Sequence, residues 1–163
     1  MTGKNTYRVT YDYTQQLVAP PDEVFPLICP VREAEWLEGF EYAWVYSESG
    51  LAEMNAIFTT PPHGPMPASL WVITRHDPQH HVVDMVRVTG EWYVTHFRVA
   101  VEEAPGGGSA AHIAYTYTAL GDMGERAIRH HHSEQEFRAM VTHWERAVNH
   151  YLETGEALPL GSG

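Results

Sequence analysis

Apolar and polar residues alternate along most of this chain, which is the pattern of strands in a sheet with one buried face. Residues 6–19 begin the pattern, with Tyr7, Val9, Tyr11 and Tyr13 on one face and polar residues on the other. Six further strand-like runs follow, and turn sequences rich in glycine and proline separate them. These runs cover residues 43–49, 53–60, 69–77, 81–89, 91–103 and 110–120.

Helical patterns occupy the two remaining parts of the chain. Residues 22–28 and 33–39 predict two short helices directly after the first strand, with Pro20 and Pro21 before the first and Pro30 between the two. From about residue 123 to 155, apolar residues recur at spacings of three and four, which predicts one long amphipathic helix. Its apolar stripe consists of Phe137, Met140, Val141, Trp144, Val148, Tyr151 and Leu152.

The order of elements predicts an α+β fold. Consecutive strands joined by short turns pair antiparallel, and the apolar face of the resulting sheet must be covered. The C-terminal helix is the only predicted element long enough to cover it. We therefore expect a single domain over residues 1–163, in which a curved seven-stranded antiparallel sheet wraps around a long C-terminal helix. The space between sheet and helix is where a ligand would bind.

Several segments resemble one protein superfamily. They are APPDEVFPLI, Trp36 in EAEWLEGF, LWVITRHDP, YTYTAL with Gly124 after it, and WERAVNHYLETG. Together they resemble a bacterial member of the START-like helix-grip superfamily, often labelled SRPBCC, which also holds polyketide cyclases, pollen-allergen-like proteins and lipid-transfer domains. The resemblance covers about residues 6–156. It implies the fold and hydrophobic ligand binding, but the superfamily shares no catalytic motif that could be carried over to this chain.

Composition excludes several classes of function. The formal net charge is -11 with only ten Lys and Arg, so no basic patch for nucleic acid is expected. The N-terminus lacks a signal-peptide pattern, and no apolar run approaches membrane-spanning length. These features predict a soluble, cytoplasmic protein. The single cysteine, Cys29, excludes an internal disulfide, and no cofactor is indicated.

The stretch IRHHHSEQEFRAM, residues 128–140, carries the candidate catalytic groups. If the long helix is regular, His130, Ser133 and Glu134 continue its inward stripe, whereas His131 and His132 lie on the flank and outer face. His130 and Glu134 are therefore candidates for a general acid–base pair, at the polar end of a cavity or else at a solvated helix end. They do not predict a metal site, because zinc needs three or four protein ligands and the helix supplies two.

Aromatic and apolar residues on the inward faces of strands and helix are the candidate ligand-binding residues. With the two polar candidates, the set is Trp36, Phe58, Trp71, Tyr93, Phe97, Tyr115, Tyr117, His130, Glu134, Phe137, Met140 and Trp144. Glu53 and Arg75 either enter the cavity or lie at an exposed edge. His96 and Arg98 alternate with apolar residues and are expected to face solvent.

Three functions follow from this reading of the sequence. The leading hypothesis is binding of a small hydrophobic molecule, aromatic or polyketide-like, between sheet and helix. The alternative is a cyclase, dehydratase or hydrolase that uses the same cavity. The third is a module with a filled core that acts as a homodimer or binds a partner through an exposed face.

Overall fold

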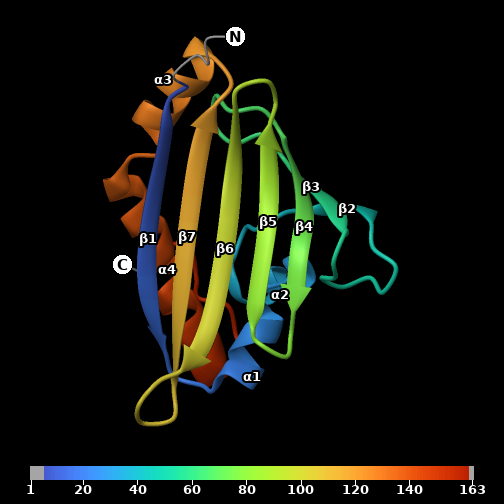
Figure 1. Cartoon of the computed structure of the whole chain (residues 1–163). Coiled ribbons are helices and arrows are strands. Elements are labelled where there is room, and N and C mark those ends of the chain that lie inside the picture. The colour runs from blue at the N-terminus through green and yellow to red at the C-terminus, as the bar shows by residue number, and fades with distance from the viewer. Residues whose placement is uncertain (1–5, 162–163) are drawn as a thin grey trace.

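Seven strands form one antiparallel sheet in the order β1-β7-β6-β5-β4-β3-β2 (Figure 1). The structure is a computed structural model, and it describes residues 6–161. The strands are β1 (Arg8–Leu17), β2 (Ala43–Tyr46), β3 (Ile57–Thr60), β4 (Ser69–Asp77), β5 (Val82–Thr89), β6 (Tyr93–Glu103) and β7 (Ser109–Ala119). The predicted number of strands and their antiparallel pairing are confirmed. The first and last strands of the chain pair along their whole length, from Arg8 with Thr118 to Leu17 with Ser109.

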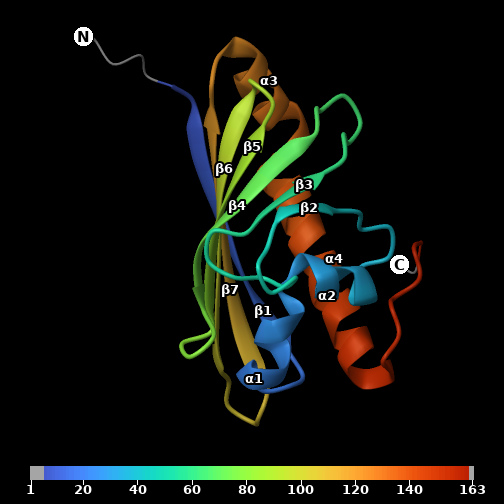
Figure 2. The ribbon, with the colours of Figure 1, turned by 90° about the vertical axis from the view of Figure 1, so that its right-hand side faces the viewer.

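The helices all lie on one side of this sheet (Figure 2). Three short pieces follow β1, namely α1 (Pro21–Val24), the 3-10 helix η1 (Phe25–Leu27) and α2 (Pro30–Trp36). The C-terminal part holds α3 (Asp122–His131) and α4 (Glu134–Thr154). The long helix α4 crosses the concave face, and α3 lies at the end of the sheet where β7 finishes. No described helix is long and apolar enough to cross a membrane.

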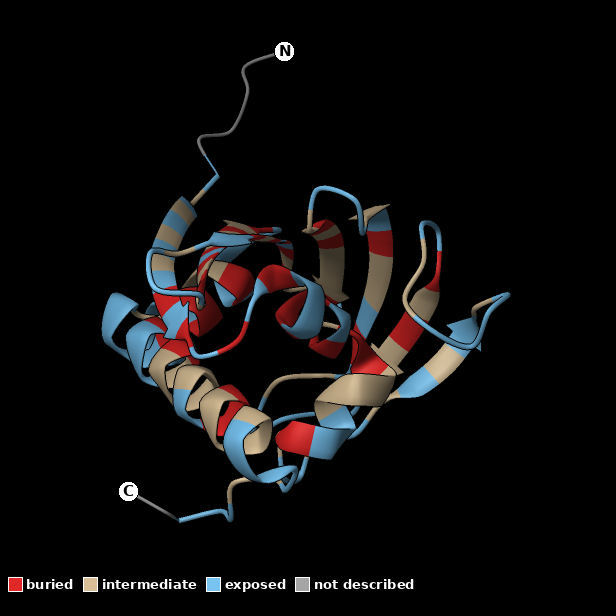
Figure 3. Ribbon diagram, turned by 90° about the horizontal axis from the view of Figure 1, so that it is seen from below, coloured by how far each residue is buried: buried red, intermediate tan, exposed pale blue. Residues whose placement is uncertain are grey.

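The buried residues lie mainly on the strands and on the helices that face them across the concave side of the sheet (Figure 3). Every second residue of β6 and β7 is buried from Tyr93 to Val101 and from Ser109 to Ala119, as alternation predicts for a strand with one covered face. Helix α4 contributes Phe137, Val141 and Val148 to the same core. Burial of these apolar side chains supplies the main stabilising free energy of the fold.

Helix α4 also pairs with the free edge of β1. The Glu145 carboxylate accepts a hydrogen bond from the backbone N–H of Gln16 at 2.6 Å. The Asn149 side chain accepts from Val18 N–H at 3.0 Å and donates to the Gln16 carbonyl at 3.0 Å. An edge strand exposes unpaired backbone groups, so these side chains satisfy groups that would otherwise be free to pair with another chain.

The predicted single helix from about 123 to 155 is wrong, because the chain leaves the helix at His132 and begins a new one at Glu134. Ser133 is the N-cap of α4: its hydroxyl accepts from Glu136 N–H at 3.2 Å, and the Glu136 carboxylate accepts from Ser133 N–H at 3.1 Å. This capping box satisfies two backbone donors at a helix start. The break changes which side chains of residues 130–134 face the sheet.

Candidate functional site

Two adjoining chambers lie between the concave face and the helices. The first, of about 470 Å³, is lined by the β3–β4 loop, the α3–α4 junction and strands β4 to β7; we call it the histidine chamber after His63, His131 and His132 in its wall. The second, of about 360 Å³, lies farther along α4 and is called the tryptophan chamber after Trp71 and Trp144. Both volumes fall in the range of small-molecule sites. Residues common to both walls are Thr60, Pro61, His63, Arg87 and Met140.

The sheet register arranges the walls in three rows, because residues paired across antiparallel strands lie side by side. The row nearest α3 is the most polar: Thr60, Ser69, Thr89 and Tyr93. The middle row is mixed: Phe58, Trp71, Arg87, Thr95 and Tyr117. The third row is mainly apolar: Ile73, Met85, Phe97 and Tyr115. The concave face therefore changes from polar to apolar along the direction that runs from α3 to α2.

His132 and two tyrosines form the polar side of the histidine chamber. His132 Nε2 lies 2.8 Å from the Tyr93 hydroxyl, which also lies 3.1 Å from the sulfur of Met66. The imidazole stacks on the Tyr117 ring, with centroids 4.6 Å apart. Burial, and secondarily the positive charge of Arg87, lowers the pKa of His132 to about 3. The imidazole is therefore neutral at physiological pH and can both donate and accept a hydrogen bond.

Aromatic rings surround the tryptophan chamber. Phe58 stacks on Trp71 at 5.5 Å, and Phe97 meets Tyr115 edge-to-face at 4.9 Å. Glu33 of α2 brings a carboxyl group to the same wall. No side-chain hydrogen bond reaches that carboxyl group from residues 6–161, and burial raises its pKa to about 7. The chamber thus combines rings that can stack on an aromatic ligand with one carboxyl group that can exchange a proton near neutral pH.

The predicted inward-facing residues lie at these cavity walls. Phe137, Tyr93 and Tyr117 line the histidine chamber, and Met140 lines both chambers. The tryptophan chamber is lined by Phe58, Trp71, Phe97, Tyr115 and Trp144. Trp36 instead borders a separate small pocket of about 40 Å³, where its Nε1–H donates to the Leu27 carbonyl at 3.0 Å. Trp36 is therefore a buried core residue and does not line either chamber.

The geometry expected for His130 and Glu134 is wrong. Both residues are exposed, and neither lines a chamber. The reason is the break between α3 and α4: the inward stripe of α4 cannot be continued back through a non-helical residue, and α3 has its own phase, in which Ile128 is fully buried. His132, expected on the outer face, is the histidine that enters the cavity.

The other uncertain polar residues lie away from the chambers. Glu53 accepts hydrogen bonds from the backbone of Ser49 in the loop that follows β2. Arg75 is exposed and pairs with Asp77. His96 and Arg98 are exposed, as predicted from the alternation in β6. Among residues 6–161, no three His, Cys, Asp or Glu side chains lie close enough together to hold a metal ion.

Sequence reasoning missed Arg87, His132 and Glu33. The spacing Ser133-x-x-Glu136 is a capping-box signature, and it could have located the start of α4 and hence the break that turns His132 inward. Arg87 shares a strand face with Val83 and Met85, but Val86 and Val88 make the opposite face equally apolar, so alternation did not decide its direction. No local signal distinguishes Glu33 from Glu35, the other glutamate of its helix.

Comparison with known proteins supports the fold. Neither a protein-family model nor a curated protein sequence matches the chain. The crystal structure of Ara h 8.0201 aligns with 91% of this chain and 99% of its own, with a TM-score of 0.66 and 15% identity. Norcoclaurine synthase from Thalictrum flavum aligns with 94% of this chain and 96% of its own, with a TM-score of 0.67 and 11% identity. The chain has the helix-grip fold.

The helix-grip fold confirms the architecture that the sequence resemblance implied. A third solved structure with this fold, an uncharacterised protein from Rhizobium leguminosarum, aligns with 91% of this chain and 97% of its own, with a TM-score of 0.60 and 15% identity. A point mutant of the Thalictrum synthase has been solved in complex with a transition-state analogue. Because fold alone does not determine function, the chemistry of this helix-grip protein is argued below from its own residues.

Proposed function

We propose that this protein binds one small, mostly apolar molecule with an aromatic body in the two chambers between the sheet and α4. The observation that carries the proposal is the pair of adjoining chambers, with volumes of about 470 and 360 Å³. A core used only for packing leaves few voids larger than a water molecule, whereas these spaces match the size of small-molecule sites.

The shape and chemistry of the walls support an aromatic ligand. Trp71 and Phe58 are nearly parallel, at 8°, and Phe97 meets Trp71 edge-to-face at 6.4 Å. Rings held in this way offer both faces and edges to a further ring. Polar groups are concentrated near His132 and Tyr93, so an apolar body would be oriented by one polar end.

A neutral apolar fluorophore, N-phenyl-1-naphthylamine, tests the proposal. We expect saturable binding at about one molecule per chain, with quenching of tryptophan emission by energy transfer, because Trp71 and Trp144 border the cavity. Met140→Trp should reduce the affinity at least about tenfold, since the larger side chain enters both chambers.

The matched control is Ala139→Trp, on the exposed face of the same helix. It should bind the fluorophore as the wild type does. If the folded wild-type protein binds no probe, or if both tryptophan variants lose binding equally, the cavity is not the binding site and a module with a filled core becomes the better account.

A second candidate function is acid–base catalysis in the same cavity. Glu33 favours it, because a carboxyl group with a pKa of about 7 in an apolar chamber can both accept and release a proton at physiological pH. The Tyr115 hydroxyl lies within electrostatic reach of this carboxyl group. The titration of Glu33, argued in the Discussion, tests the property on which this candidate depends.

A further inference from the structure

Arg87 occupies the centre of the concave face. It lies in the middle of β5 and is paired with Trp71 of β4 on one side and Thr95 of β6 on the other. Its side chain lies at the boundary between the histidine chamber and the tryptophan chamber, whose walls it shares. A molecule that extends from one chamber into the other would lie along a wall that includes Arg87.

The contacts of Arg87 leave its positive charge without an anionic partner. One Nη donates to the Thr95 hydroxyl at 3.3 Å, and the guanidinium carbon lies 5.1 Å from the Trp71 ring and 5.8 Å from the Tyr93 ring. Its Nε–H is sealed from solvent and has no hydrogen-bond partner. Among the ion pairs formed by residues 6–161, none includes Arg87.

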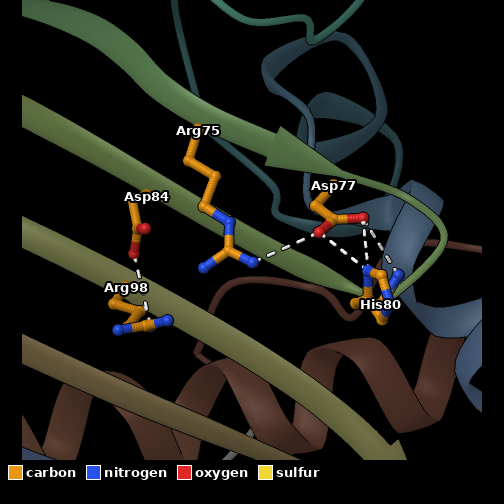
Figure 4. Close-up of polar contacts among 5 residues, drawn as sticks. All are labelled: Arg75, Asp77, His80, Asp84 and Arg98. Carbon is orange, nitrogen blue, oxygen red and sulfur yellow. Dashed lines mark hydrogen bonds and ion pairs between the residues drawn. The ribbon is translucent and has the colours of Figure 1, made fainter.

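Two arginines on the outer face of the same sheet, unlike Arg87, each pair with a carboxylate (Figure 4). Arg75 pairs with Asp77 at 3.2 Å, and Arg98 pairs with Asp84 at 3.4 Å. These exposed cations need a partner least, because water already solvates them. The half-buried Arg87 has the greater need of an anionic partner, because removing a charge from water costs free energy unless the charge is paired.

The other ionisable groups of the chambers do not neutralise Arg87. His132 is uncharged at neutral pH and contributes no negative charge. The Glu136 carboxylate is engaged in the capping box of α4, and Glu41 lies at an exposed part of the wall. Glu33 lies in the tryptophan chamber, but its carboxyl group forms no ion pair with Arg87. The cavity of this strongly acidic protein thus holds one uncompensated positive charge.

We propose that Arg87 binds the carboxylate of the ligand, whose aromatic body then occupies the tryptophan chamber. This inference rests on the proposed function and specifies the class of ligand, an aromatic monocarboxylate. The guanidinium carbon lies over the Trp71 ring at 5.1 Å, one Nη donates to Thr95, and Nε–H has no hydrogen-bond partner. The planar fork of a guanidinium matches the two oxygens of a carboxylate. We infer one carboxylate on the ligand rather than two, because Arg87 is the only lysine or arginine among the described residues that line either chamber.

The experiment compares three ligands of one shape: naphthalene-2-carboxylate, naphthalene-2-carboxamide and 2-naphthyl phosphate. Isothermal titration calorimetry gives their affinities for the wild-type protein, and N-phenyl-1-naphthylamine reports separately whether the cavity binds any apolar molecule. We expect the carboxylate to bind at least about tenfold more tightly than the carboxamide, as is typical of a charge-assisted hydrogen bond. The phosphate should bind no better than the carboxylate.

Arg87→Met should weaken carboxylate binding about tenfold to a hundredfold and leave the binding of the neutral fluorophore within about threefold. Arg98→Met is the matched control, because it makes the same change of net charge on the outer face of the neighbouring strand. It should change neither affinity. If Arg87→Met does not fold, Arg87→Lys, which keeps the charge but loses the planar pair of donors, should retain a reduced preference for the carboxylate.

The outcomes separate this inference from the proposed function. Absence of fluorophore binding would contradict the proposed function itself. Fluorophore binding with equal affinities for carboxylate and carboxamide in the wild type would overturn the role of Arg87 alone. A clear preference for the phosphate, lost in Arg87→Met, would assign the site to phosphate esters and overturn the carboxylate. A carboxylate preference that survives in Arg87→Met would place the anion elsewhere.

Discussion

Arg87, His132 and Glu33 are among the ionisable side chains that border the cavity, and they respond differently to burial. Arg87 keeps its charge, because a guanidinium does not lose its proton in proteins. His132 and Glu33 instead become neutral over a wider pH range, since burial disfavours the charged form of each. Arg87 therefore supplies a positive charge to the cavity, and the protonation of His132 and Glu33 makes the stability of the fold depend on pH.

The low pKa of His132 makes the protein less stable in acid. The folded-state pKa of about 3 lies below the ordinary 6.5, so the unfolded chain takes up a proton below pH 6.5 while the folded chain does not. Stability is therefore lost as pH falls from about 6.5 towards 3. Between pH 7.5 and pH 5 we expect a loss of about 2 kcal/mol from this group. Urea unfolding of wild type and His132→Gln measures it, and the variant should lose correspondingly less.

The control for this acid effect is His130→Gln, on the exposed surface of α3. Its stability should follow the wild-type pH dependence. If His130→Gln removes the acid loss and His132→Gln does not, the inward histidine has been assigned to the wrong position.

The raised pKa of Glu33 should make the protein less stable as the pH rises, which is opposite to the effect of His132. Its folded-state pKa of about 7 lies above the ordinary 4.5, so the unfolded chain ionises first and stability falls as pH rises from about 4.5 to 7. Between pH 5 and pH 8 the loss should be about 2 kcal/mol, and Glu33→Gln should abolish it. Unfolding experiments at both pH values measure the difference, with exposed Glu153→Gln as the control. A Glu33→Gln variant with the wild-type pH dependence would remove the basis for acid–base catalysis by this residue.

At the scale of elements, the break between α3 and α4 determines the polar end of the cavity. Helix α3 packs so closely on the β5–β6 turn that a Cβ on Gly124 would lie 1.7 Å from the Trp92 carbonyl oxygen. Only glycine fits at this contact. The position of α3 against the sheet and the start of α4 at Ser133 are thus separately fixed, and His132 lies between them as the residue that joins two helices of different phase.

The capping box gives a prediction for this junction. Ser133→Ala removes the hydroxyl that accepts from Glu136 N–H, and it should lower the free energy of unfolding by about 1 kcal/mol. It should also weaken fluorophore binding, because loss of the cap loosens the junction that carries His132 in the cavity wall. Thr142→Ala is the control, at a half-buried position of the same helix that lines neither chamber: its hydroxyl donates to the Arg138 carbonyl, and its loss should change stability by less than about 0.5 kcal/mol. Equal losses in the two variants would argue against a separate helix start at residue 134.

At the scale of the whole molecule, the sheet separates two environments of charge. The outer face carries paired ions such as Arg98 with Asp84, and the chain as a whole has a net charge of -11. The concave face holds Arg87 between aromatic rings and neutral polar groups. An anionic ligand would therefore be repelled at long range and bound only on reaching the cavity, so its recognition depends on close contacts rather than on electrostatic steering.

The sequence by itself determined the seven strands, the antiparallel pairing of consecutive strands and the inward set of aromatic residues. Alternation in segments such as 93–103 and 109–119 leaves one register in which the apolar side faces the core, so a local pattern is enough to predict it. The stripe of α4 from Phe137 to Val148 was predicted for the same reason, because helical periodicity is also local.

Tertiary structure decided the polar chemistry of the cavity. His132, rather than His130, faces the sheet because α3 and α4 are placed independently by Gly124 and Ser133. Arg87 faces inward because the register of β5 places it in one row with Trp71 of β4 and Thr95 of β6, which local alternation of valines on both faces did not reveal. The loss of water around His132 depends on neighbours distant in sequence, and this desolvation lowers its pKa and keeps its imidazole neutral.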